Sequence, residues 1–367
     1  MRVTLVTNSI PPYRESLYEC LNARVSGGLR VVTTLRDTLA PRRYEVVSCR
    51  LCTAIPRWRH HPLGYRDRAR TPIPLLLARD IGECDVIVVH GLGLSTMAAA
   101  LHARRLGIPM VVWATLSLDT ELGRGWITTT ARRRLIQHAA AVIVNGASGR
   151  RYVDDLVAGG REVPIIAVPY TIETAPFLSI PIERTADQRH RLLTIGQLIP
   201  RKGLLEFADT VAAWLDSHPA RVITWTIVGE GVLRNTLEHR RPHSRLLIDV
   251  RAGVKYDQLQ SVYAEHGVFV FPTLADEWGV VVNEAMASGL PVLGSVRAQA
   301  VQELVVDGET GVTFDPLGSN DQKTAAFERL LERSDLDAMG RKARSVAMRV
   351  TAADAAARIV ELLETVA

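Results

Sequence analysis

Two short segments in the second half of the chain carry the charged residues that are best placed to act on a ligand. In the first segment, 194–203, a short strand pattern ends, and Arg201 and Lys202 precede Gly203 and a helical pattern. Cations beside the N-terminal N–H groups of a helix form a site for an anion, and a lysine ammonium contacts phosphate oxygens directly. The segment therefore predicts a phosphate site, with a solvated Arg-Lys pair as the alternative.

The second segment, 271–291, places an acidic loop between a buried strand and an apolar helix. Asp276 and Glu277 lie in the loop, and Gly279 lets the backbone pass close to a neighbouring group. Glu284 lies about one turn into the helix among apolar residues, where burying an unpartnered carboxylate is costly. A ribose diol is a suitable partner because a carboxylate accepts hydrogen bonds only. An arginine of the same domain is the alternative partner.

The elements that position these residues alternate along both halves of the chain. Short runs of Val and Ile followed by helical patterns predict βαβ units and parallel sheets buried on both faces. The predicted strands are 3–7, 29–34, 86–90, 110–114, 141–145, 165–169, 192–195, 222–228, 246–250, 268–272, 291–294 and 311–314. The clearest predicted helices are 94–106, 147–158, 204–215, 231–238, 257–264 and 280–287, and 320–366 is nearly all helical.

This order of elements predicts an α/β chain with two Rossmann-like, doubly wound domains in series. The first domain is expected over 1–175, a linker with Pro176 and Pro181 over 176–190, the second domain over 191–345, and a final helix over 346–367 that packs back on the first domain. Ligands of such sheets bind beyond the carboxyl ends of the strands. No G-x-G-x-x-G follows the first strand and no Walker A motif occurs, which argues against nicotinamide dehydrogenases and P-loop enzymes.

Charge is unevenly distributed along the chain. The net charge is +5, but residues 1–175 hold 23 arginines against 14 acidic residues, and the first lysine is Lys202. A basic first half predicts an acidic partner there, either an anionic membrane surface or an anionic acceptor, and no motif points to nucleic acid. The segment 57–70, which mixes arginines with Trp58 and Tyr65, is the candidate for membrane or lipid-linked acceptor contact, with an ordinary solvated loop as the alternative.

The remaining signals concern metals and location. Cys49 and Cys52 form a lone CxxC ahead of His60 and His61, but without a second CxxC we expect reduced thiols rather than a zinc site. The apolar stretch 86–103 is interrupted by His90 and glycines, so it predicts strand, turn and helix rather than a membrane span. With no signal-peptide pattern at the start, the expected location is the cytoplasm, with peripheral contact at the inner membrane face as the alternative. His90 lies at the end of a predicted strand. It is a candidate catalytic residue, with a structural role as the alternative.

In their order along the chain, these segments resemble glycosyltransferase family 4. The family has a G-R-L-x-x-x-K-G turn, and residues 196–203 read GQLIPRKG. It also has an E-x7-E motif followed by A-M-A-x-G-x-P-V, which corresponds here to Asp276 through Glu284 and then AMASGLPV. The V-G-x-G turn at 228–231 and an E-x-V-x-x-G-x-x-G segment at 303–311 extend the likeness over most of 190–315, and 12–14 and 168–173 resemble the family weakly.

The resemblance implies a GT-B fold, in which the two Rossmann-like domains face each other across a cleft and C-terminal helices close the structure. It implies retaining transfer from a nucleoside diphosphate sugar, with UDP expected, to a glycan, lipid-linked or small-molecule acceptor. The first domain would bind the acceptor and the second the donor, with no metal or cofactor.

Motif position also implies a role for each matched residue. Lys202 would hold the diphosphate and stabilise the leaving group, Glu284 would bind the ribose hydroxyls, and Asp276 would contact the donor sugar. Lys202, Asp276 and Glu277 are the candidate catalytic residues. The other candidate donor-binding residues are Gln197, Arg201, Gly229, Val254, Lys255, Trp278, Gly279, Val280 and Val281.

Two positions depart from the family pattern. Gln197 replaces the usual arginine, so Arg201 would have to supply the second diphosphate cation. Asp276 replaces the first glutamate, and Glu277 beside it is an alternative for that role. These departures leave two other interpretations open: a nucleotide-sugar-binding protein with impaired catalysis, and a sugar-nucleotide epimerase of the same fold.

Overall fold

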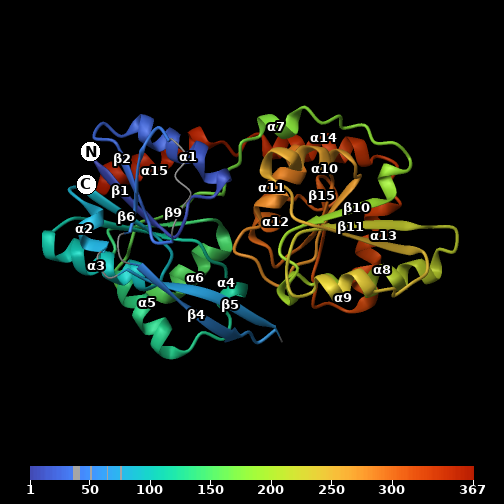
Figure 1. Cartoon of the computed structure of the whole chain (residues 1–367), viewed down its shortest axis with the longest axis horizontal. Coiled ribbons are helices and arrows are strands. Elements are labelled where there is room, and N and C mark those ends of the chain that lie inside the picture. Colours follow the sequence, from blue (N-terminus) through green and yellow to red (C-terminus); the bar gives the residue numbers. More distant parts are fainter. Residues whose placement is uncertain (36–41, 50–51, 64, 75–76) are drawn as a thin grey trace. The chain divides into compact units, whose positions relative to one another are not determined.

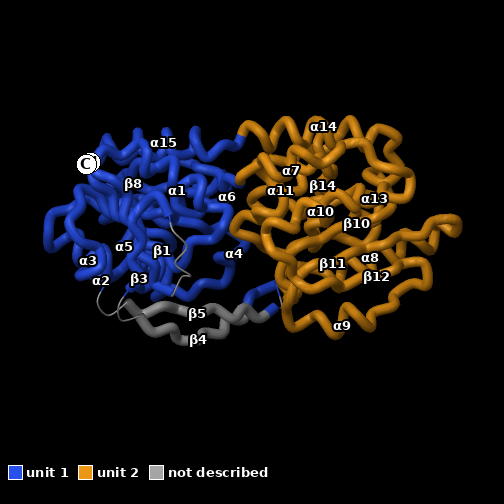
Figure 2. Tube along the Cα trace, turned by 45° about the horizontal axis from the view of Figure 1, so that its top comes forward, with its two compact units in different colours: residues 1–172, 350–367 blue, residues 173–349 orange. Residues whose placement is uncertain are grey.

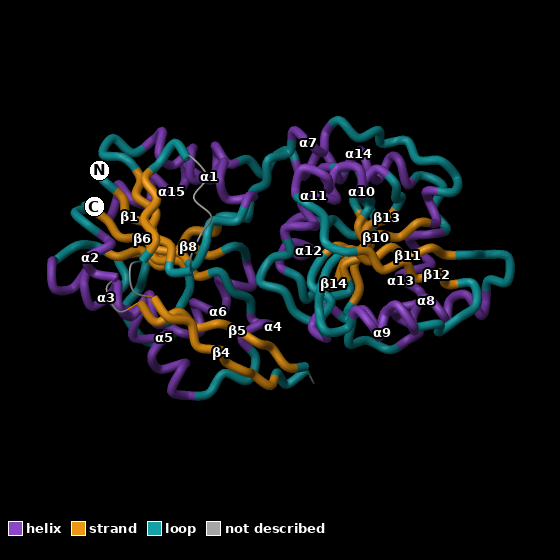
Figure 3. Tube along the Cα trace, viewed as in Figure 1, coloured by secondary structure: helices purple, strands orange, loops and turns teal. Residues whose placement is uncertain are grey.

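The computed structural model describes residues 1–35, 42–49, 52–63, 65–74 and 77–367, with only the backbone described at 52–60 and 66–74 (Figure 1). The chain folds into two compact units, residues 1–172 with 350–367, and residues 173–349 (Figure 2). Each unit is built on its own parallel sheet (Figure 3). No helix among the described residues has both the length and the apolar composition needed to cross a membrane.

The first unit contains a seven-stranded parallel sheet in the order β3-β2-β1-β6-β7-β8-β9. β1 is central: Val3 pairs with Leu29 of β2 on one side and with Val86 of β6 on the other. All five residues of β1 are buried, as expected of a Val-rich strand covered on both faces. The strands are β1 Val3–Thr7, β2 Leu29–Thr33, β3 Glu45–Ser48, β6 Val86–His90, β7 Met110–Ala114, β8 Ala141–Val144 and β9 Ile165–Ala167.

Seven described helices belong to this unit: α1 Pro12–Arg24, α2 Leu77–Ile81, α3 Leu94–Leu106, α4 Leu118–Glu121, α5 Trp126–His138, α6 Ala147–Val157 and α15 Ala352–Val366. The last of them, α15, packs against α1 and shares one apolar core with it and with β1. Its first turn is capped by Thr351, whose side chain accepts a hydrogen bond from the Asp354 N–H. The end of the chain is therefore part of the first unit.

The segment that the sequence treats as a basic loop, 57–70, is not a loop. Its backbone lies largely in an antiparallel hairpin of β4 Cys52–His60 and β5 Arg66–Pro74, in which Cys52 pairs with Pro74 and His60 with Arg66. Strand pairing satisfies backbone groups that a loop leaves to water. In the turn, His61 stacks on Tyr65 with ring centroids 4.3 Å apart. The side chains at 57–60 and 66–70, Trp58 included, lie outside the described residues, as does that of Cys52.

The second unit contains a six-stranded parallel sheet in the order β12-β11-β10-β13-β14-β15. Its core includes Trp225 of β11 and Phe207 of α8, whose rings meet edge to face 5.2 Å apart. The strands are β10 Arg191–Ile195, β11 Ile223–Val228, β12 Leu246–Arg251, β13 Val268–Phe271, β14 Val292–Ser295 and β15 Gly311–Phe314. The helical segments are α7 Ala175–Leu178, η1 Gln188–His190, η2 Pro200–Lys202, α8 Leu204–Ser217, α9 Arg234–His239, η3 Tyr256–Gln258, α10 Leu259–Ala264, α11 Val280–Ala287, α12 Gln299–Leu304, α13 Asn320–Leu331 and α14 Leu336–Ala347.

The segment 176–190, for which the sequence predicts a linker, is instead included in the second unit. Arg184 is 8% exposed, and its guanidinium donates to the carbonyls of His266 at 2.8 Å and Ser288 at 3.2 Å. Arg344 of α14 donates to the Ile180 carbonyl at 2.6 Å. Polar residues with little periodicity can therefore be tied to a domain through hydrogen bonds to its backbone, which the sequence pattern does not reveal.

Candidate functional site

The topology of the second sheet creates a crevice between β10 and β13. From β10 the chain proceeds to β11 and β12 on one side, whereas from β13 it proceeds to β14 and β15 on the other. The loops that leave the carboxyl ends of these two neighbouring strands therefore diverge, which is where ligands of open α/β sheets bind. They are 196–203 and 272–279, the two segments that the sequence singles out.

The two loops are held against each other by backbone contacts. The Arg201 carbonyl accepts hydrogen bonds from the Leu274 N–H at 2.8 Å and from Thr273 Oγ1 at 3.1 Å. Gly203 has a left-handed conformation with φ 64°, and a Cβ there would collide with the Pro272 carbonyl oxygen. The glycine before α8 is thus required by both its backbone conformation and the closeness of the second loop.

Lys202, Asp276 and Arg201 come together in this crevice. Lys202 Nζ donates a short hydrogen bond to Asp276 Oδ2, and Arg201 Nη1 lies 3.5 Å from the same oxygen. The three side chains are largely buried, with 13%, 12% and 18% exposed. Arg201 Nη1 also donates to the Ala275 carbonyl at 2.7 Å. The structure therefore joins two of the predicted catalytic residues and the substitute cation in one cluster.

The charges of this cluster stabilise one another. Burial would raise the pKa of the Asp276 carboxyl, but the positive charges of Lys202 and Arg201 outweigh it and hold that pKa below its ordinary value. Burial lowers the pKa of the Lys202 ammonium, and Asp276 only partly opposes this shift. Asp276 is therefore a charged carboxylate, and the two cations of the first loop both lie against it.

Hydrogen bonds to buried residues hold the loop after Asp276 in its conformation. Glu277 is exposed, and its carbonyl accepts a hydrogen bond from Gln299 Nε2 at 2.7 Å. Trp278 is 1% exposed and donates from Nε1 to Asn283 Oδ1 at 2.8 Å. The Trp278 indole is therefore a core residue that positions the loop, and its side chain is not presented to a ligand.

Gly279 sets the start of helix α11. It has φ 101°, and a Cβ at this position would lie 2.5 Å from the Phe271 ring. Only glycine combines this backbone conformation with so close a neighbour. Val280 and Val281 follow as half-buried residues of the first turn, where helix N–H groups have no intrahelical acceptor. Such N–H groups can contact an anion, which is compatible with the donor-binding role predicted for Gly279, Val280 and Val281.

Glu284 is buried in α11 and accepts a hydrogen bond from a tyrosine that the sequence analysis did not predict. It is 4% exposed, and its Oε2 accepts a hydrogen bond from Tyr263 Oη at 2.9 Å. Burial raises the pKa of Glu284 to about 7, and the Tyr263 hydrogen bond opposes that rise. No arginine or lysine among the described residues forms an ion pair with Glu284, so the alternative of an arginine partner is wrong.

A second tyrosine adjoins the same carboxylate. Tyr256 Oη is buried without a hydrogen-bond partner, and burial together with the charges of Glu284 and Glu173 raises the pKa of its hydroxyl. Tyr256 and Tyr263 both pack edge to face on Phe177, with ring centroids 6.2 and 5.6 Å away. The hydroxyl is a donor that only a nearby acceptor would satisfy.

The remaining predicted donor-binding residues lie on neighbouring loops of the same sheet edge. Gln197 is exposed in the loop after β10. Gly229 directly follows β11, and a Cβ there would collide with the Gly196 carbonyl oxygen, so the two loops touch. Val254 and Lys255 are both exposed in the loop after β12, directly before Tyr256. Loops from β10 to β13 thus bring all of these positions to one edge.

The corresponding edge of the first unit carries a different cluster. Arg14 of α1 is 4% exposed and donates from Nη2 to His90 Nε2 at 3.1 Å. Its guanidinium lies 4.6 Å from the Trp113 ring and 4.1 Å from the Tyr170 ring. Burial and the Arg14 charge hold the pKa of His90 well below its ordinary value, so the imidazole is neutral and accepts at Nε2. The sequence raises His90 but not the arginine that contacts it.

Comparison with known proteins identifies both halves of the chain. Residues 10–171 match the family model described as "Glycosyl transferase 4-like domain", and residues 189–333 match the one described as "Glycosyl transferases group 1". The D-inositol 3-phosphate glycosyltransferase of Acidothermus cellulolyticus is 27% identical over 65% of this chain and 57% of its own length. The sulfoquinovosyl transferase SQD2 of Arabidopsis thaliana is 28% identical over 40% of this chain and 28% of its own.

Solved structures of the same architecture cover the chain from end to end. Anabaena HepE in complex with UDP-glucose superposes with a TM-score of 0.72 at 16% identity, over 100% of both chains. A trehalose-6-phosphate protein of E. coli bound with UDP-2-fluoro glucose superposes with a TM-score of 0.70 at 14% identity, over 99% of both chains. With both halves matched by glycosyltransferase models on two parallel-sheet α/β domains, the chain belongs to glycosyltransferase family 4 and has the GT-B fold.

Proposed function

We propose that this chain transfers a hexosyl group from a UDP-sugar to an acceptor hydroxyl with retention of configuration. The observation that carries the proposal is the cluster of Lys202, Arg201 and Asp276 beside buried Glu284 at one edge of the second sheet. UDP-glucose and UDP-2-fluoro glucose are bound in the similar structures of HepE and the E. coli protein. Those ligands support UDP as the nucleotide of this chain.

In this proposal the diphosphate binds the cations and the helix start. Lys202 and Arg201 supply two positive charges, and the first N–H groups of α11 add a third favourable element. Breaking the anomeric C–O bond places negative charge on the diphosphate, and Lys202 stabilises it electrostatically. This arrangement requires neither a metal nor a cofactor. Arg201 takes the place of the cation that Gln197 does not provide.

The carboxylates are proposed to bind hydroxyl groups. Glu284 receives the ribose hydroxyls, which stabilise its charged form and lower the pKa that burial has raised. Asp276, released from Lys202 when the diphosphate arrives, contacts hydroxyls of the donor sugar, with Glu277 as the alternative. Val254, Lys255 and Tyr256 lie beside the base. The acceptor, whether glycan, lipid-linked or small molecule, binds through the first unit.

Two rival functions rest on the same site. Gln197 and Asp276 depart from the family motif and favour a nucleotide-sugar-binding protein with impaired catalysis. An epimerase would use the donor without any acceptor. An assay of UDP release and of sugar products distinguishes these two functions from a transferase. The donors are UDP-glucose, UDP-galactose and UDP-N-acetylglucosamine, with and without added glycosyl acceptors.

The proposal predicts slow UDP release from one donor, and an accelerated release with an α-linked product when a suitable acceptor is present. A Lys202→Ala variant should lose both, whereas the exposed control Lys342→Ala should keep them. A new sugar nucleotide formed without an acceptor would instead support the epimerase. Tight UDP binding with no release from any donor would support the binding protein.

A further inference from the structure

Helices α3 and α5 of the first unit lie side by side and start at the same end. β6, β7 and β8 are consecutive neighbours in the sheet, α3 connects the first pair, and α4 with α5 connects the second. Right-handed crossovers between strands that advance in one direction place their helices on one face of the sheet. α3 and α5 are in contact. Because both lead from the carboxyl end of one strand to the start of the next, they run in the same direction.

The outer surfaces of these helices carry exposed apolar side chains, along much of α3 and at the first turn of α5. On α3, Leu94, Met97 and Leu101 are 41%, 47% and 54% exposed and follow the i, i+3, i+7 spacing of one helix face. In the turn before α5, Leu122 is 40% exposed, and Trp126 and Ile127 at the start of α5 are 77% and 66% exposed.

This concentration of apolar side chains is specific to one region. With Leu106 at the end of α3, these residues are all the exposed large hydrophobic side chains in the described part of the first unit. Scattered exposed apolar residues are ordinary on protein surfaces, whereas a contiguous group marks an interaction site.

The second halves of the two helices carry arginines. Arg104 and Arg105 are exposed on the last turn of α3, and Arg133 and Arg134 are exposed on α5, seven residues after Trp126 and Ile127. Neither α3 nor α5 contains an aspartate or a glutamate. The combined surface therefore presents apolar side chains and positive charge without any compensating acid of its own helices.

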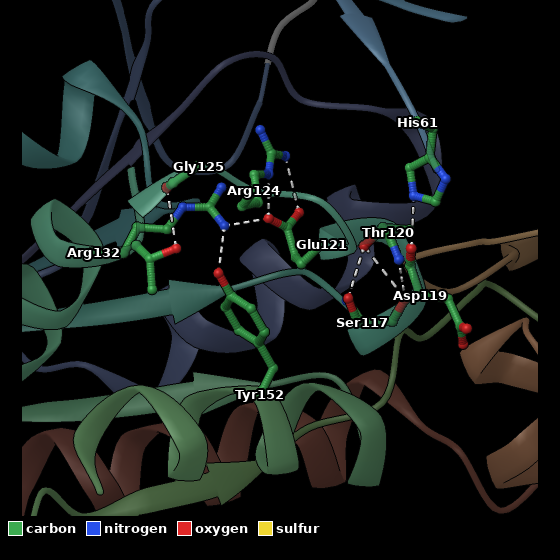
Figure 4. A network of polar contacts seen from close by, with 10 residues as sticks. His61, Ser117, Asp119, Thr120, Glu121, Arg124, Gly125, Arg132 and Tyr152 are labelled. Atoms are coloured by element: carbon green, nitrogen blue, oxygen red, sulfur yellow. Dashed lines mark hydrogen bonds and ion pairs between the residues drawn. The ribbon is translucent and has the colours of Figure 1, made fainter. Parts of the chain in front are cut away.

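A buried network holds the apolar turn in place (Figure 4). Glu121, at the end of α4, accepts hydrogen bonds from Arg124 Nε at 2.6 Å and Arg124 Nη2 at 3.0 Å. Arg132 of α5 also donates to Glu121, and its Nη1 donates to Tyr152 Oη of α6 at 2.8 Å. These contacts join residues before and after Leu122 and Trp126. They therefore hold the backbone that presents the two apolar side chains in a defined conformation.

We infer that the outer surfaces of α3 and α5 dock the protein on an anionic phospholipid bilayer, with Trp126, Ile127 and the α3 leucines in the interface and the arginine pairs against the headgroups. Tryptophan favours the bilayer interface, and each arginine near an anionic surface adds to the attraction. A second copy of the chain is a poor occupant, because two such surfaces would bring like-charged arginines together. The membrane contact expected at 57–70 stays a separate prediction, because most side chains of that segment lie outside the described residues.

The inference goes beyond the proposed transfer activity, because docking needs neither donor nor acceptor. The test is co-sedimentation of the full chain with phosphatidylcholine vesicles, and with vesicles that also contain phosphatidylglycerol, in the absence of any nucleotide. Binding is expected only to the anionic vesicles and should weaken as salt rises. Failure of this test leaves UDP binding unaffected, so the two proposals fail separately.

Two pairs of variants identify the surface. Trp126→Ser with Ile127→Ser should lower vesicle binding about tenfold or more, whereas Val232→Ser, at a 78% exposed residue of the second unit, should not. Arg104→Gln with Arg105→Gln should lower it about 25-fold, at about fivefold for each arginine. Removing two exposed arginines elsewhere in the first unit, Arg151→Gln with Arg358→Gln, should have a clearly smaller effect.

Besides a failure of the wild type to bind anionic vesicles, two outcomes would overturn the inference. One is anionic vesicle binding that all four variants retain alike. The other is self-association, measured by sedimentation velocity without lipid, that Trp126→Ser with Ile127→Ser abolishes, because the surface would then serve a second copy. A far-UV circular dichroism spectrum and a melting temperature equal to those of the wild type show that each variant is folded.

Discussion

The two sheets have the same strand order around their centres, but different side chains lie at the equivalent sheet edge. In both, the first strand of the unit neighbours the strand at which the direction of winding reverses. In the second unit that position holds Lys202 paired with Asp276 and, nearby, the buried carboxyl of Glu284. In the first unit it holds the Arg14 guanidinium between aromatic rings, beside neutral His90.

In the proposed function, this difference suits the two units to different ligands. Charged side chains that can exchange partners suit a nucleoside diphosphate, which brings both negative charge and ribose hydroxyls. A cation that is held by rings and a neutral histidine is less free to exchange. The topology therefore predicts where ligands bind, whereas the side chains at that edge determine which ligand binds.

The largest expected effect concerns Glu284 and its pH dependence. Burial raises its pKa from 4.5 to about 7, so between these values the folded chain binds more protons than the unfolded chain. The free energy of unfolding therefore falls as pH rises through this window, by about 3 kcal/mol, and stays low above it. Glu284→Gln should consequently stabilise the protein at about pH 8 and have little effect at about pH 4.5.

Urea unfolding at both pH values measures this difference. Glu206→Gln, at an exposed glutamate of α8, is the matched control and should change neither value. The same Glu284→Gln variant should bind UDP more weakly, although it is more stable. An equal stabilisation at both pH values would contradict the raised pKa of Glu284.

Lys202→Ala is expected to have the next largest effect, on turnover. It removes charge-assisted hydrogen bonds worth about 1.5–3 kcal/mol each, so turnover should fall by about tenfold or more. Lys342→Ala removes an exposed lysine of the same unit and should leave turnover unchanged. Steady-state rates with the authentic donor decide the matter, and a Lys202→Ala enzyme with normal turnover would exclude the proposed role.

A pair of glycines compares the two sheet edges directly. Gly279 has φ 101° and Gly91 has φ 91°, but only at Gly279 would a Cβ meet the Phe271 ring, at 2.5 Å. Gly91→Ala should cost only the left-handed backbone term, about 1–2 kcal/mol. Gly279→Ala should cost more by about 1–3 kcal/mol for the overpacking. Thermal unfolding of both variants measures the difference, and equal losses would mean that Phe271 moves aside freely.

The smallest effect on donor binding is expected for Arg14→Gln. The variant loses cation–π contacts with Trp113 and Tyr170 worth about 0.5–2 kcal/mol each, so the protein should unfold at a lower temperature. Its UDP affinity, measured by calorimetric titration, should equal that of the wild type because the donor residues lie in the second unit. A weakened UDP affinity would contradict the assignment of the donor to that unit alone.

Much of the fold could be predicted because each buried parallel strand is a short continuous run of Val, Ile or Leu. The predicted strands of both sheets and helices such as α3 and α11 agree with the structure to within a few residues. The donor-site prediction depended on motifs that are contiguous in sequence. Lys202 and Asp276 were given separate roles from the motifs, and only the structure shows that they contact each other.

The elements that could not be predicted lack that pattern. In α5, the apolar residues Trp126 and Ile127 are exposed and Arg132 is buried. Its sequence therefore lacks the pattern of buried apolar and exposed polar residues by which a helix is predicted. Tyr263 reaches Glu284 from another helix, and Arg14 and Trp113 meet only through the sheet topology. Contacts between residues far apart in sequence leave no local signal.

The most direct test of the donor site is the thermal stability of the purified protein with UDP, GDP, ADP, CDP and NAD. A ligand that binds only the folded state adds about 2.7 kcal/mol of stability at a hundredfold excess over Kd. We expect UDP alone to raise the melting temperature, and Glu284→Ala to abolish the rise. No stabilisation by any nucleotide, or a rise that persists in Glu284→Ala, would contradict the assignment of the donor site.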